Sequence, residues 1–366
     1  MKLLLCSLCL LLLSIASPAQ APAQNVFIIT IDGIRWQEIF KGADETLLRN
    51  IAFVQDTGIM LQQYGNPDPA VRRKRLLPFF WSVIAAQGQL YGNREFENKV
   101  NVANLYKISY PGYSEIFTGY ADKLFIPNLA VRNPRSNVLQ YLNNQQDFNG
   151  KVAAFCSWKV FPFILDEKNG QLPVNAGYEK TDGQTSYDTL FNSIQESVED
   201  KTNTRHDLLT FECAKNYLQK QHPRVLYLGL GETDHFAHHG AYDQYLQKLH
   251  QADAIIAELW YYVQTDPFYK NNTSFIITTD HGRGNNSNWK THGFWIKGSG
   301  ETWLAMIGAG ISATGEEKTQ QQLYQKQLAA TITSLLGLPF IAGHRVANPV
   351  TIQEEDIKRT MSAYLK

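Results

Sequence analysis

The stretch Val26-Phe27-Ile28-Ile29-Thr30-Ile31-Asp32-Gly33 decides the fold of this chain. Its first six residues are almost all apolar, and they predict a strand that is buried on both faces, as the strands of parallel sheets are. Asp32 and Gly33 follow at the carboxyl end of this strand. In doubly wound sheets ligands bind beyond the carboxyl ends of the strands, so the same stretch also indicates where a site would lie.

Further apolar runs predict four more buried strands, at residues 152–155, 225–230, 275–278 and 304–307. Apolar residues at three- and four-residue steps predict helices over 245–263 and 321–336, and Gly337 and Pro339 are suited to end the second one. The alternation of strands and helices predicts an α/β layered sandwich with a largely parallel central sheet flanked by helices.

One segment fits this alternation poorly. Residues 158–205 contain several Pro and Gly residues and predict an irregular insertion with one helix near 190–198. Such an insertion in a compact enzyme is either a lid or a solvated excursion without a role. The remainder, residues 24–366, is expected to form a single catalytic domain that carries this insertion.

The first 23 residues resemble a secretory signal peptide. Lys2 is followed by an uncharged run from Leu3 to Ala16 and then by small residues, which predicts cleavage after Ala19 or Ala23. The run is too short to span a bilayer, so we expect no stable membrane anchor and a secreted or periplasmic protein.

The charge balance of the chain gives no support for a nucleic-acid partner. Lys plus Arg and Asp plus Glu both number 34, so the charge offers no argument for nucleic-acid binding. Cys156 and Cys213 remain after the signal. Two buried thiols are the simpler interpretation, with a disulfide as the alternative.

Acidic residues follow three of the predicted strands. They are Asp32, Asp234 within Gly231-Glu232-Thr233-Asp234, and Asp280, which His281 follows directly. Asp234 and His238 are four residues apart, so one helical turn would place both on the same face. Mixed carboxylate and imidazole donors favour zinc, and five or six such donors exceed one tetrahedral ion, which implies two divalent ions.

Most histidines in a protein are surface or hydrogen-bonded residues and bind no metal. We apply this interpretation to His206, His222, His250 and His344. His235 and His239 are expected to be neighbours of the site and not ligands. His292 lies in a loop rich in Gly and Asn and joins the candidate ligands.

Ser109 is the best candidate for a nucleophile. It precedes Pro111, which suits the first turn of a helix that would start just after Ser109. The free N–H groups of that turn would face a phosphate, and a metal would favour the alkoxide. The alternative is an ordinary helix-capping serine.

The ordered set of motifs resembles the alkaline phosphatase superfamily, particularly its nucleotide pyrophosphatase and phosphodiesterase branch. The motifs are Asp32-Gly33, Ser109-Tyr110-Pro111 with Thr118-Gly119, Asp234 with His238, Asp280-His281-Gly282 and His292-Gly293. The resemblance implies one zinc ion held by Asp32, Ser109, Asp280 and His281. A second zinc ion would be held by Asp234, His238 and His292.

The chain departs from this pattern in three places. The diesterase branch commonly has Thr as the nucleophile, whereas here it is Ser109. The phosphate-binding Asn of the family is either Asn128 or Asn133. The gap from His281 to His292 is short for a pyrophosphatase.

The expected function is therefore a secreted two-metal hydrolase of small-molecule phosphate esters, a phosphodiesterase or phosphomonoesterase that forms a phosphoserine at Ser109. One alternative is a sulfatase-like hydrolase, although Tyr113 stands where the sulfatase signature has Arg. The other alternative is an inactive secreted binding protein of the same fold.

Overall fold

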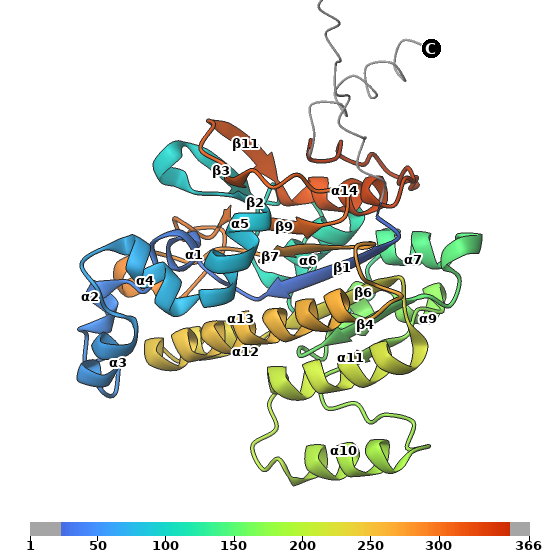
Figure 1. Cartoon of the computed structure of the whole chain (residues 1–366), viewed down its shortest axis with the longest axis horizontal. Helices are drawn as coiled ribbons and strands as arrows, with labels where there is room; N and C mark the ends of the chain where they lie inside the picture. Colours follow the sequence, from blue (N-terminus) through green and yellow to red (C-terminus); the bar gives the residue numbers. More distant parts are fainter. Residues whose placement is uncertain (1–22, 352–366) are drawn as a thin grey trace, which may run out of the picture.

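The computed structural model describes residues 23–351, which are built around a central sheet (Figure 1). Its centre is an eight-stranded sheet in the order β10-β2-β9-β7-β1-β6-β4-β5. The strands are β1 (Asn25–Ile31), β2 (Gly88–Tyr91), β4 (Val152–Cys156), β5 (Val174–Ala176), β6 (Val225–Leu230), β7 (Thr273–Thr278), β9 (Leu304–Gly308) and β10 (Gly315–Glu316). Only β9 is antiparallel to its neighbours, β2 and β7. The predicted α/β fold with a largely parallel sheet is confirmed.

The opening stretch of the sequence forms the central strand. All seven residues of β1 are buried, and β1 pairs in parallel with β6 and β7. Thr30 lies opposite Gly229 on one side and Thr278 on the other. Because the three strands run in the same direction at this register, the residues that follow them meet at one edge of the sheet.

Side chains of β1 alternate between two cores. Phe27, Ile29 and Ile31 belong to a core on one face, together with side chains of α11 (Asp207–Gln221) and α13 (Tyr242–Thr265). Val26 and Ile28 belong to a core on the other face, with α6 (Ser109–Thr118), α7 (Val138–Asn143) and α14 (Leu328–Leu335). Figure 1 shows these two helical layers on either side of the sheet. The helix predicted over 245–263 lies within α13.

The remaining helices are short. They are α1 (Trp36–Lys41), α2 (Glu45–Leu48), α3 (Thr57–Tyr64), α4 (Pro69–Leu76), α5 (Ala85–Gln87), α8 (Phe161–Ile164), α9 (Glu167–Gly170), α10 (Ser186–Ser197) and α12 (Glu232–His238). Single turns or short irregular helices complete the set: η1 (Phe80–Ile84), η2 (Arg94–Phe96), η3 (Gln146–Phe148), η4 (Asn286–Lys290) and η5 (Gln325–Gln327).

The helix predicted over 321–336 is wrong in its first part. A second sheet, in the order β11-β3-β8, contains β11 (Gln321–Tyr324), β3 (Asn98–Asn101) and β8 (Glu301–Thr302). Residues 321–324 pair with β3 as a strand, and the helix starts only at α14. Pairing with a distant strand overrides the local periodicity, which a sequence window cannot detect.

Residues 158–205 are more regular than expected. β5 pairs with β4 and forms an edge strand of the main sheet. The predicted helix starts four residues earlier, as α10, because Thr185 and Asp188 form a capping box. α10 lies against α11, where the Tyr187 hydroxyl donates to the carbonyl of Glu212, so this part of the segment adds an outer helical layer (Figure 1).

Cys156 and Cys213 are both buried free thiols, as the simpler interpretation predicts. Burial raises the pKa of Cys156 well above its usual value and that of Cys213 to about 11. Within residues 23–351 no helix has both the length and the apolar character needed to cross a bilayer. Residues 1–22 of the expected signal peptide lie outside the described residues, and Ala23 is the first residue described.

Candidate metal and nucleophile site

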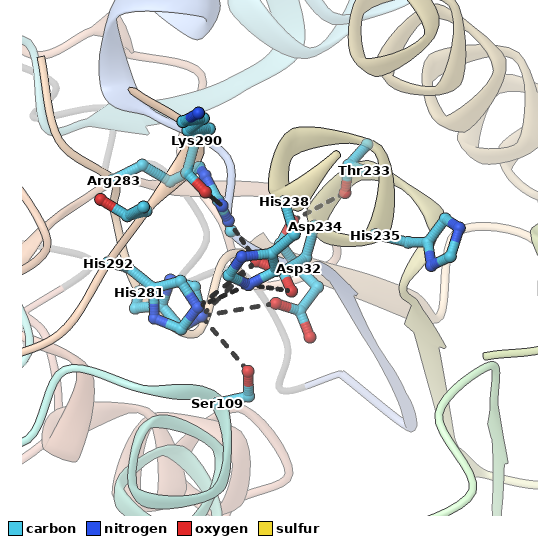
Figure 2. Close-up of polar contacts among 12 residues, drawn as sticks. Asp32, Ser109, Thr233, Asp234, His235, His238, His281, Arg283, Lys290 and His292 are labelled. Carbon is cyan, nitrogen blue, oxygen red and sulfur yellow. Dashed lines mark hydrogen bonds and ion pairs between the residues drawn. The ribbon is translucent and has the colours of Figure 1, made fainter. Parts of the chain in front are cut away.

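The carboxyl edge of the central strands brings the candidate ligands together (Figure 2). Asp32 follows β1, and Asp280 and His281 follow β7. Asp234 and His238 lie one turn apart on α12, which starts directly after β6. The predicted ligands thus come from three adjacent parallel strands, and the loop residue His292 joins them.

The first group surrounds one nitrogen of His281. Its Nε2 lies 3.6 Å from Asp32 Oδ1, 3.3 Å from Asp280 Oδ2 and 3.3 Å from Ser109 Oγ. All four residues are buried. Asp32 Oδ1 and Asp280 Oδ2 have no hydrogen-bond partner, although buried carboxylate oxygens normally have one. Two orphaned carboxylate oxygens, an imidazole nitrogen and a hydroxyl that face one another fit a divalent cation.

The other polar atoms of this group are fixed by hydrogen bonds. The Tyr113 hydroxyl donates to Asp32 Oδ2 at 2.9 Å, and the Gly33 N–H donates to Asp280 Oδ1 at 3.0 Å. His281 Nδ1 donates to the Gly282 carbonyl at 2.9 Å, which leaves Nε2 as the acceptor. Each side chain therefore has one atom held and one available for a metal.

The second group contains Asp234, His238 and His292. The two histidine Nε2 atoms are 3.0 Å apart, and they lie 3.2 Å (His238) and 3.7 Å (His292) from the Asp234 carboxylate. His292 Nδ1 donates to the Lys107 carbonyl at 3.1 Å, which turns Nε2 toward the group. His281 Nε2 is 4.0 Å from Asp234, farther than from Asp280, so we assign His281 to the first group.

Burial controls protonation at the site. It raises the pKa of Asp280 to about 7, with a contribution from Asp234, and raises that of Asp32 well above its usual value. Burial lowers the pKa of His292 to about 4 and that of His281 well below its usual value. Burial also opposes ionisation of Asp234, but Arg283 and the nearby histidines outweigh it and hold that pKa low. Burial therefore favours the neutral form of His281 and His292, the form that binds metals.

Ser109 is the first residue of α6, one position earlier in the helix than predicted. Every residue of α6 is buried. Gly112 allows the helix to approach β7, because a Cβ there would lie 2.5 Å from the Asp280 carbonyl oxygen. The close approach carries Ser109 to the first group.

The two candidate phosphate-binding asparagines differ in position. Asn128 is exposed, and its Oδ1 accepts the N–H of Tyr110, the residue after Ser109. Asn133 is buried, and its side chain donates to Ser114 Oγ and accepts the N–H of Arg135. The Asn133 side chain is engaged in hydrogen bonds to Ser114 and Arg135, whereas the amide group of Asn128 lies at the start of α6.

Sequence reasoning missed three side chains that contact the candidate ligands. Besides Tyr113, the Thr233 hydroxyl donates to the Asp32 carbonyl at 2.7 Å. Arg283 is fully buried and bonds to the Asp234 carboxylate (Figure 2). A signal for Arg283 existed, since a charged residue stands three positions after Asp280, but neither periodicity nor spacing marks it as buried.

Other polar residues near the motifs have partners of their own. Glu232 accepts the Asp207 N–H and pairs with His206 and Lys248. His250 bonds to the Leu76 carbonyl and His344 to that of Thr118. The backbone N–H of His222 caps α11. His239 bonds to the carbonyl of His235 and stacks near its ring. None of these side chains belongs to either donor group.

One family profile matches most of the chain. The profile of the type I phosphodiesterase / nucleotide pyrophosphatase family matches residues 47–327, a region that begins after Asp32 and includes the other candidate ligands. No curated protein sequence matches the chain significantly.

Solved structures share the fold. Wild-type alkaline phosphatase PafA is 12% identical with a TM-score of 0.60, over 91% of this chain and 99% of that one. The lipoteichoic acid synthase LtaP from Listeria monocytogenes is 11% identical with a TM-score of 0.57, over 90% and 75%. The 2-O GAG sulfatase BT1596 is 13% identical with a TM-score of 0.54, over 89% and 73%. With the family profile covering most of the sequence, the chain belongs to the type I phosphodiesterase / nucleotide pyrophosphatase family of phosphoester hydrolases.

Proposed function

We propose that this chain is an exported hydrolase of small-molecule phosphate esters that holds two zinc ions and uses Ser109 as its nucleophile. The observation that carries the proposal is the first donor group. Two buried carboxylate oxygens without hydrogen-bond partners face the nitrogen of His281, and Ser109 Oγ lies 3.3 Å from that nitrogen. Such an arrangement is costly without a cation and favourable with one.

The residues divide between the two ions. Asp32, Asp280, His281 and Ser109 would hold one, and Asp234, His238 and His292 the other. When bound, two zinc ions would supply positive charge that favours the Ser109 alkoxide and stabilises the charge on the leaving oxygen. Three carboxylates and the Ser109 alkoxide would balance the charge of two zinc ions, and Arg283, which bonds to the Asp234 carboxylate, adds positive charge beside an anionic ester.

The covalent step takes place at Ser109. Its deprotonated Oγ attacks phosphorus, the bond from phosphorus to the alcohol oxygen breaks, and the alcohol leaves with a proton from water. A second water then hydrolyses the phosphoserine and releases phosphate or a phosphate monoester. The exposed amide of Asn128, held at the start of α6, is placed to donate to a phosphate oxygen.

The test compares an aryl phosphate monoester, an aryl phosphate diester and an aryl sulfate, each with added zinc. We expect phosphate ester hydrolysis that chelator abolishes and zinc restores. Acid quenching during turnover followed by mass spectrometry should find phosphate on the Ser109 peptide. Faster turnover of the sulfate would favour the sulfatase alternative, and no turnover of any ester would favour the binding protein.

Export is tested separately. N-terminal sequencing of protein recovered outside the cytoplasm should begin near Gln20 or Gln24, since the segment from Lys2 to Ala23 resembles a signal peptide. Recovery of exported protein with Met1 intact would contradict this part of the proposal and leave the chemistry unaffected.

A further inference from the structure

The loop between His281 and His292 folds back on itself. The Gly284 N–H donates to the Thr291 carbonyl at 3.0 Å, and the turn η4 lies between them. Trp289, within the turn, is fully buried and packs edge-on against Tyr242 and Tyr245. This closed loop is what allows a ligand only eleven residues after His281 to turn back toward the same site.

Arg283 lies at the base of this loop and is buried to 1% exposure. Its Nε donates to the Trp289 carbonyl at 2.8 Å and its Nη2 to the Lys290 carbonyl at 2.6 Å. Its Nη1 bonds to Oδ1 of Asp234 on α12. Figure 2 shows the guanidinium between Asp234 and the backbone of Lys290. One side chain therefore joins a ligand on the helix to the backbone two residues before a ligand on the loop.

We propose that Arg283 is a positioning residue for the second metal, which fixes the distance between Asp234 and His292. This inference rests on the proposed two-zinc function. The planar fork of Arg suits the task because its three nitrogens bond in three fixed directions, two to carbonyls and one to a carboxylate. Lys would keep the positive charge beside Asp234 but has no such fork, so it could not hold both segments.

The experiment measures zinc affinity and not rate. Arg283→Lys and Arg283→Gln are titrated with zinc in competition with a chromophoric chelator, and near-ultraviolet circular dichroism checks that each is folded. We expect wild type to bind two ions. Each variant should bind one ion with wild-type affinity and the second at least about 10-fold more weakly, as for other side chains that orient metal ligands.

Arg205 provides a matched control. It is also fully buried, and its Nη1 donates to Asn175 and its Nε to Thr210, away from every candidate ligand. Arg205→Lys and Arg205→Gln should lower the thermal midpoint in chelator as the Arg283 variants do, while both zinc affinities stay at the wild-type value. A purely structural role for Arg283 would make the two pairs of variants alike.

A double-mutant cycle gives the sharpest test. If Arg283 acts through the His292 loop, Arg283→Lys in the His292→Ala background should weaken second-site zinc much less than in wild type. Full additivity, or wild-type second-site affinity in Arg283→Lys, would overturn the inference while the two-zinc proposal stands. Wild type that binds no zinc would overturn both.

Discussion

The two donor groups are built in different ways. Asp32, Asp280 and His281 follow strand ends, Ser109 starts a buried helix, and the side chains of the three ligands besides Ser109 are at most 7% exposed. In the second group Asp234 is 17% and His238 45% exposed, whereas His292, which comes from a loop, is 5% exposed. The first group is held by the core of the fold, whereas the second is assembled from a short helix and a loop that other side chains must hold.

The largest expected effect lies in the first group. Ser109→Ala should lower kcat on the order of 10³-fold or more, because it removes the hydroxyl that contacts the His281 nitrogen. Circular dichroism and zinc content should stay close to wild type. Ser109→Thr should keep part of the rate because it keeps the hydroxyl. Normal turnover by Ser109→Ala, or phosphate on Ser114 or Thr118, would show that the nucleophile is wrongly assigned.

Removal of one ligand from each group should distinguish the zinc ion of the first group from that of the second. His292→Ala should weaken zinc binding at the second group, leave the first group mostly filled and lower kcat on the order of 10²-fold, because only the second group loses a ligand. Asp280→Asn should lose zinc from the first group and approach the inactivity of Ser109→Ala. Elemental analysis of chelator-free protein checks both.

The contrast between the two donor groups fails if His292→Ala leaves metal content and rate unchanged, since His292 would then not be a ligand of the second group. It also fails if Asp280→Asn and His292→Ala lose the same zinc ion and show the same rate, since the groups would then not be separable.

The pH dependence of the metal-free protein should report the first group. The pKa of Asp280 is raised to about 7 in the fold from 3.8, so between these values the native state holds a proton that the unfolded state releases. Stability from this group is present at low pH and is lost as the pH rises toward 7, by about 1.4 kcal/mol per pH unit for each such proton. Zinc should remove this loss, because a cation favours the ionised carboxylate.

Thermal midpoints in chelator from about pH 5 to pH 8 provide the measurement. Asp280→Asn is the control, because other groups such as His292, whose pKa is lowered to about 4, change stability in the opposite direction. Wild type should lose more stability across this range than Asp280→Asn. Equal pH profiles for the two proteins would contradict the raised pKa.

The smallest effects concern the two asparagines. Asn128→Ala should lower kcat/KM by about 10-fold through loss of one charge-assisted hydrogen bond, with little change in stability. Asn133→Ala should instead lower stability by about 1 kcal/mol and leave kcat/KM unchanged, because its amide bonds to Ser114. The opposite pattern would mean that the buried asparagine binds the phosphate.

The sequence predicted the three central strands and the candidate ligands that follow them. The apolar runs gave all three central strands, and register in a parallel sheet then places Asp32, Asp234 and Asp280 together. His238 followed from helical spacing on α12. The sequence could bring these candidate ligands together because a strand or a helical turn fixes their direction within a few residues.

What could not be predicted depends on contacts between distant segments. The strand at 321–324 forms only because β3 pairs with it. Tyr113 and Arg283 contact ligands 81 and 49 residues away along the chain, and no local pattern encodes such a contact. The role of His292 needs the fold of its loop, and Asn128 could be distinguished from Asn133 only by their hydrogen bonds.

The buried thiols have a practical consequence. Cys156 and Cys213 are the cysteines beyond the expected signal peptide, and both are free, inaccessible and held in the unreactive protonated form. Recombinant production of the mature chain thus needs no oxidising compartment. A single cysteine engineered at a surface position, such as Tyr261 on α13, would be the one site that a maleimide dye modifies in the native protein. A fluorescent reporter could be attached in this way without first removing the natural cysteines.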